Sequence, residues 1–135
     1  MFKDTRTYTD FNGVERTEDV YFHLSIPELI DMQFDSGEDS YADYIEKVLA
    51  AKDSKKLIEI FKSLLLKSYG QKSEDGRTFR KTSELTNDFE CSQVYADLYM
   101  QLATDSDYAA KFINGIVPSD LDAQIAKFQN KMENA

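Results

Sequence analysis

Residues 5–24 read TRTYTDFNGVERTEDVYFHL, and this stretch predicts a β-hairpin at the start of the chain. Threonine recurs at alternate positions before Asn12-Gly13, a pair that tolerates the positive φ angles of a two-residue hairpin turn. A turn of that length fixes the strand register, so we expect Arg6 to lie opposite Asp19 as a pair of unlike charge.

The second predicted strand carries its large apolar side chains on one face, at Val20, Phe22 and Leu24. An isolated two-stranded hairpin is only marginally stable in water, so this face needs a cover of helices, further strands or another chain. We expect the hairpin to occupy residues 1–24 and a helical core to follow over 25–117, which gives an α+β fold that is mostly helical.

Caps and apolar periodicity predict a series of helices after the hairpin. Ser25 and Glu28 have the spacing of a capping box for a short helix that ends near Gln33. Gly70 is the predicted stop of a longer helix. The polar stretch 71–82 then predicts a loop or a second short hairpin near 72–81. The helix that ends before Gly70 covers residues 54–69, and the other predicted helices cover 41–51, 83–90, 92–104 and 107–114.

A last helix is predicted within residues 118–135. Its apolar side chains form one narrow stripe: Leu121, Ile125, Phe128 and Met132. A stripe of this width is typical of a seam between two helices. The partner helix belongs either to this chain or to another, so we expect a mobile or intermolecular C-terminal helix in a single domain that spans 1–135.

Composition and charge exclude several classes of protein. No apolar stretch approaches the ~20 residues of a membrane span, and one cysteine excludes an internal disulfide framework. The net charge of −9 argues against general binding to nucleic acid, whose phosphates attract bases. The charge is uneven, because residues 52–81 hold nine bases and four acids. We expect an intracellular protein that associates with itself or with a partner of complementary charge.

No catalytic, cofactor or metal site is predicted. His23 and Cys91 are the single histidine and cysteine, and His23 lies out of phase with the buried face of its strand. Asp107 follows Ser106, the predicted cap of a helix, where a carboxylate stabilises the helix dipole. The acidic stretch 35–40 lacks the alternation of a calcium loop. We therefore expect neither an enzyme nor a cofactor.

Three surfaces are candidates for contact with a partner protein. The first is a leucine on the lysine-bearing side of the helix over 54–69, the second is the basic stretch 71–82, and the third is the C-terminal stripe. Their candidate contact residues are Leu66, Arg77, Phe79, Arg80, Leu121, Ile125, Phe128 and Met132.

Three segments resemble a known family. They are YTDFNGVERTEDVYFHLS at 8–25, IEIFKSLLLKSYGQKSEDGRTFRKT at 58–82 and LYMQLATDSDYAAKFINGIVP at 98–118. The residue pattern of these segments and their order along the chain resemble those of tail assembly chaperones of long-tailed, siphovirus-type phages and prophages of Gram-positive bacteria. The resemblance implies a protein that keeps the tape measure protein soluble and helps the major tail protein to polymerise around it as the tail tube.

The same resemblance implies a chaperone of the bacterial host cytoplasm that is absent from the mature virion. It implies self-association into oligomers, rings or spirals, and a second, frameshifted form of which this chain is the short version. It implies no nucleic acid and no membrane as partner.

The alternative from another class is an acidic protein that mimics DNA and inhibits a host nucleic-acid-binding protein. Its support is a cluster of acids: Asp31, Asp35, Glu38, Asp39 and Asp43. The basic segment 52–81 argues against it, because a mimic should be acidic over most of its surface. A small hydrolase would need a site that the sequence does not show.

Overall fold

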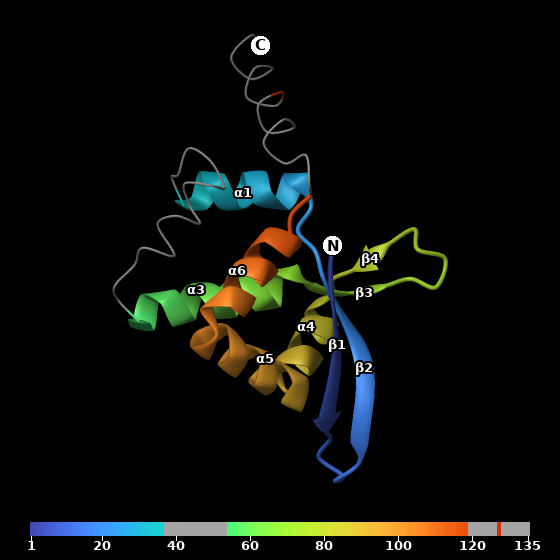
Figure 1. Ribbon diagram of the computed structural model, residues 1–135. Coiled ribbons are helices and arrows are strands. Elements are labelled where there is room, and N and C mark those ends of the chain that lie inside the picture. Colours follow the sequence, from blue (N-terminus) through green and yellow to red (C-terminus); the bar gives the residue numbers. More distant parts are fainter. Residues whose placement is uncertain (37–53, 119–126, 128–135) are drawn as a thin grey trace.

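The computed structural model describes residues 1–36, 54–118 and 127, and within them it has an α+β fold (Figure 1). The strands form one antiparallel sheet in the order β1-β2-β3-β4. The predicted fold class is therefore confirmed. The predicted helix over 41–51 and the four residues of the C-terminal stripe lie outside the described residues. The elements are β1 (Phe2–Thr9), β2 (Glu15–Phe22), α1 (Ile26–Ser36), α3 (Ser54–Ser68), β3 (Tyr69–Lys72), β4 (Phe79–Arg80), α4 (Ser83–Glu90), α5 (Gln93–Thr104) and α6 (Ser106–Gly115).

The turn of the N-terminal hairpin differs from the prediction. The backbone N–H of Asp10 donates to the carbonyl of Val14, and of the turn residues only Gly13 has a positive φ, of 81°. The loop therefore has three residues instead of two. The side chain of Asp10 favours this turn, because its Oδ1 accepts from the N–H groups of Asn12 and Val14 at 2.9 Å each.

The longer loop shifts the strand register by one residue from the prediction. Arg6 lies opposite Glu18, and Thr5 lies opposite Asp19. The predicted pair of Arg6 and Asp19 is therefore wrong. Arg6 Nε instead lies 2.8 Å from Asp4 Oδ2, while the Asp19 carboxylate accepts from Thr5 Oγ1 at 2.7 Å.

The buried face of β2 is as predicted and forms the centre of the core. Val20, Phe22 and Leu24 are buried, and helices supply most of the remaining core side chains. The ring of Phe22 lies edge-on to the rings of Phe89 and Phe112, with centroid distances of 5.8 and 5.3 Å. The helices thus cover the face that a two-stranded hairpin could not protect alone.

Of two helix caps predicted from the sequence, the structure confirms one and corrects the other. Ser25 and Glu28 form the predicted capping box, in which the Ser25 N–H donates to Glu28 Oε1 at 3.0 Å and the Glu28 N–H donates to Ser25 Oγ at 3.4 Å. Helix α1 continues to Ser36, three residues beyond the predicted end. The cap of α6 is Asp105 and not Ser106, because the Asp105 side chain accepts from the Tyr108 N–H at 3.1 Å.

The stretch 71–82 was predicted to be either a loop or a second short hairpin. The structure has the hairpin. The prediction that Gly70 stops a helix is wrong, because α3 ends at Ser68 and Gly70 lies in β3 opposite Tyr21. A Cβ atom on Gly70 would lie 2.7 Å from the ring of Phe79 and 2.8 Å from the carbonyl oxygen of Arg80. Close approach of β4 therefore requires glycine here.

The arrangement leaves part of the first hairpin beyond the helices. Figure 1 shows α3 to α6 on one side of β1 and β2, whose connecting loop extends past α5. Residues 11–19 are all exposed, including Phe11 and Val14 at the loop. The β3–β4 hairpin projects in another direction.

Candidate functional site

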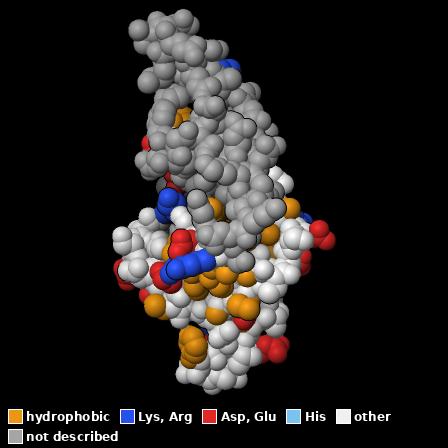
Figure 2. All heavy atoms as spheres, turned by 90° about the vertical axis from the view of Figure 1, so that its left-hand side faces the viewer, with side chains coloured by type: hydrophobic (Ala, Val, Ile, Leu, Met, Phe, Trp, Pro, Cys, Tyr) orange, Lys and Arg blue, Asp and Glu red, His pale blue; other side chains and the backbone are white. Residues whose placement is uncertain are grey.

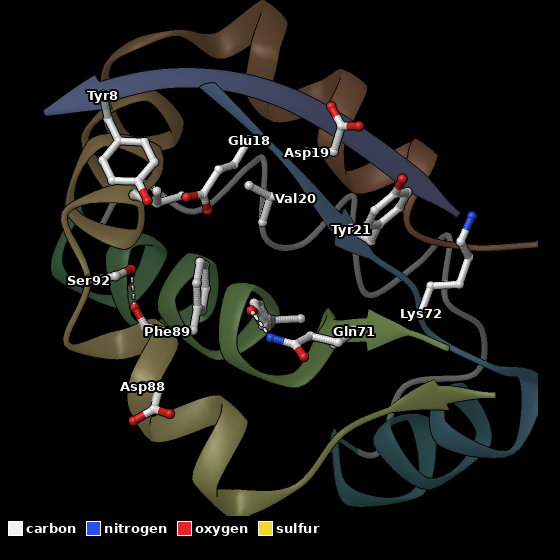
Figure 3. Close-up of a pocket in the computed structure, with 13 residues that line it drawn as sticks. Tyr8, Glu18, Asp19, Val20, Tyr21, Gln71, Lys72, Asp88, Phe89 and Ser92 are labelled. Carbon is white, nitrogen blue, oxygen red and sulfur yellow. Dashed lines mark hydrogen bonds between the residues drawn. The ribbon is translucent and has the colours of Figure 1, made fainter. Parts of the chain in front are cut away.

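A groove of about 380 Å³ lies between strand β2 and the turn that joins α4 to α5 (Figure 3). Its walls come from β1, β2, β3 and the segment from the end of α4 to the start of α5, so distant parts of the sequence form it. The residues with large side chains that line it are Tyr8, Glu18, Asp19, Val20, Tyr21, Tyr69, Gln71, Lys72, Asp88, Phe89 and Val94.

The floor of the groove is apolar and held in place. The ring of Phe89 stacks on Tyr69 with a centroid distance of 4.0 Å and an interplanar angle of 24°. Val20 and Val94 are buried beside it. Ser92 fixes the turn below, since its Oγ donates to the Phe89 carbonyl at 2.6 Å and caps α5. A fixed apolar floor suits an apolar side chain of a partner.

The rim of the groove is acidic. Glu18, Asp19 and Asp88 lie along it, and Lys72 is the only base among the described residues that line the groove. A hydrogen bond from Thr5 holds the pKa of Asp19 below its ordinary value, so this carboxylate is charged at neutral pH. Such a rim attracts lysine and arginine.

The edge of β2 opens on the groove. Strands β2 and β3 pair only at Tyr21–Gly70 and Phe22–Tyr69, after which β3 turns toward β4. The part of β2 before Tyr21 is therefore not covered by β3. Backbone groups, an apolar floor and an acidic rim thus occur together, and this combination can bind a peptide segment.

A comparison with protein families gives a match over the whole chain. The model of a family described as phage tail assembly chaperone matches residues 1–135. The chain belongs to this family of phage tail assembly chaperones. The family predicted from the three sequence segments is thereby confirmed. Searches of curated proteins and of solved structures give no significant match.

The described part of the chaperone offers little for catalysis or metal binding. His23 is half-buried with its ring edge-on to Phe79, and burial lowers its pKa. Cys91 is exposed at the C-cap of α4. Within residues 1–36 and 54–118, no three metal-ligating side chains gather. None of the helices in these ranges is long and apolar enough to cross a membrane.

Four of the contact residues predicted from the sequence, Leu66, Arg77, Phe79 and Arg80, lie within the described residues, and none of these four lines the groove. Arg77 and Arg80 are exposed on the second hairpin, and Phe79 packs half-buried against Gly70. Leu66 is half-buried against the core. The groove itself was missed, because only the folded chain brings its residues together. One signal was present: tyrosines such as those that line it are enriched where a surface is partly buried.

Proposed function

We propose that this chaperone binds the tape measure protein, keeps it soluble and promotes polymerisation of the major tail protein around it. The observation that carries the proposal is the family match over residues 1–135. The proposal places the protein in the cytoplasm of a Gram-positive host and outside the mature virion. Its role is to bind protein chains, without a chemical step.

The groove supports this proposal physically. A long chain that awaits assembly exposes apolar side chains, and Val20, Phe89 and Val94 offer an apolar surface of matching kind. A net charge of −9 keeps a chaperone and its bound client in solution. Contacts with a partner protein at the C-terminal stripe, at Leu66 and at the basic residues of the second hairpin are part of the proposal, and so is self-association.

The DNA-mimic alternative has less support. On the face shown in Figure 2, hydrophobic side chains lie between acidic and basic ones. A mimic of DNA needs an extended surface of one charge. The groove, with an apolar floor inside its acidic rim, also fits a protein segment better than it fits the DNA-binding surface of a host protein.

Co-expression tests the proposed function. The tagged chain is expressed with the large tape-measure-like protein of the source genome, and an unrelated long helical protein serves as the control client. We expect the tape measure protein to become soluble and to co-purify, whereas the control client does not. A tape measure protein that stays insoluble with both this chain and its frameshifted form would contradict the proposal.

A further inference from the structure

We propose that the exposed edge of β2 accepts an extended segment of the client as an added β-strand. The segment alternates apolar side chains, which enter the groove, with lysine or arginine, which lie on the opposite face of the sheet near Glu15 and Asp19. That the client is the tape measure protein rests on the proposed function. The mode of binding and the chemistry of the segment rest on the geometry of the groove.

The direction of the backbone groups in β2 is set by its two neighbours. Asp10 and Val14 form a hydrogen-bonded pair, so the even-numbered residues of β2 point their N–H and C=O groups toward β1. The odd-numbered residues point away from β1, as the N–H of His23 shows when it donates to Ser68 O at 2.8 Å. This outer side faces β3 at one end and the groove at the other.

Three residues therefore present unpaired backbone groups along this edge. They are Glu15, Thr17 and Asp19, whose N–H and C=O groups meet no hydrogen-bonding partner within the described residues. Proteins usually shorten or cover such an edge, because it is a template for another strand. Here the edge is continuous with the paired end of β2, so an added strand would extend the sheet in the place that β3 leaves.

The side chains of an added strand would alternate in the same way as those of β2. Figure 3 shows Tyr8, Glu18 and Val20 on the side of the hairpin that faces Phe89. Every second side chain of the added strand lies on that same side, above Phe89 and Val94. An apolar residue at these positions would contact the floor of the groove. The added strand is therefore expected to carry an apolar residue at every second position.

Charge identifies the segment as basic and argues against a second copy of β2. The edge and rim carry four acids, of which three lie in β2: Glu15, Glu18, Asp19 and Asp88. Arg16 lies 2.6 Å from Asp10 and 3.6 Å from Glu18, and Lys3 Nζ lies 3.6 Å from Asp19. Lys72 Nζ lies over the ring of Tyr21, so the acids of this region outnumber its bases. Another β2 strand would bring the same acids against these, and facing like charges destabilise a strand pair.

A peptide tests the binding mode on the full chain. The probe is a seven-residue peptide of alternating lysine and apolar residues, with a central phenylalanine. We expect it to bind and to slow hydrogen exchange at the amides of Glu15, Thr17 and Asp19 by about tenfold or more. The same peptide N-methylated along one edge, or with glutamate in place of lysine, should bind at least about tenfold more weakly. Binding without slower exchange at these amides would overturn the proposal.

Two threonines provide matched variants of the protein. Thr7 and Thr17 lie opposite each other with their Oγ atoms 2.9 Å apart, and their N–H groups point to opposite outer edges of the hairpin. Proline removes an N–H only from its own edge. We expect Thr17→Pro to weaken peptide binding about tenfold or more, and Thr7→Pro to change it by less than about twofold. Unchanged binding in Thr17→Pro contradicts strand addition, and if either variant fails to fold, the N-methylated peptide on the native chain decides.

Co-purification separates this proposal from the proposed function. If the native chain and Thr17→Pro both co-purify with the tape measure protein to the same extent, strand addition is wrong and the function stands. If the native chain fails to co-purify while the peptide still protects the edge amides, the function is wrong and the strand site stands.

Discussion

Asp10 illustrates how one side chain decides the pairing of two strands. Its carboxylate accepts two backbone N–H groups of the loop and lies 2.6 Å from Arg16 Nε. The hydrogen bond from Arg16 and those from the loop lower the pKa of Asp10. The Asn-Gly pair alone favours a two-residue turn, but these contacts favour the loop of three. An aspartate two residues before the pair is the signal in the sequence for the register that the structure has.

Glu28 makes stability depend on pH. Burial acts to raise its pKa, but hydrogen bonds from Lys81 Nζ and from Ser25 outweigh burial and hold the pKa below its ordinary 4.5. A carboxyl with a lowered pKa contributes stability above its unfolded pKa and loses that contribution as the pH falls through the folded value. We expect the melting temperature to fall below about pH 4.5, and to fall less steeply in Glu28→Gln.

The measurement is thermal unfolding between about pH 7 and pH 3, followed by circular dichroism. Glu74→Gln in the exposed turn of the second hairpin is the control. An identical pH dependence in the native chain and in Glu28→Gln would contradict the role given to the Glu28–Lys81 contact.

Gly70 is constrained by the strand that lies against it. We expect Gly70→Ala to destabilise the fold by about 1–3 kcal/mol, because the new Cβ meets both the Phe79 ring and the Arg80 carbonyl. Replacement of Phe79 by leucine in the same chain should restore only part of that loss, since the carbonyl remains. Urea unfolding measures both effects, and full rescue by the leucine would show that the backbone contact is unimportant.

At the scale of elements, the starts of helices follow local rules more closely than the strand pairs do. The capping box at Ser25 and the helix over 83–90 were predictable because caps act within three or four residues. The register of the hairpin and the place of Gly70 were not, because they depend on contacts that the chain makes elsewhere. The groove depends on contacts of this kind throughout, since β2, β3 and α4 must all be in place before it exists.

Two single substitutions test which residue is the N-cap of α6. We expect Asp105→Ala to cost about 1 kcal/mol of stability, because the Tyr108 N–H loses its acceptor. Ser106→Ala, one position later, should change stability by less than about 0.5 kcal/mol. Chemical denaturation of the two variants compares them, and a larger loss in Ser106→Ala would restore serine as the cap.

At the scale of the whole molecule, shape and charge agree with the work of an assembly chaperone. The helices and sheet enclose one continuous core, while the loop of the first hairpin and the second hairpin project from it. A net charge of −9 accompanies a groove with an apolar floor. The protein thus combines an acidic composition with a groove whose floor is apolar. Composition and charge predicted the first property, and only the fold reveals the second.

Suppression of aggregation tests the central claim most directly. Purified tape measure protein is diluted from denaturant into buffer with or without the chain, and light scattering is recorded, with serum albumin as the control additive. The chaperone function predicts that scattering falls as the chain is added toward a stoichiometric ratio, and that both proteins elute together afterwards. Scattering that matches the albumin control at every ratio would contradict it.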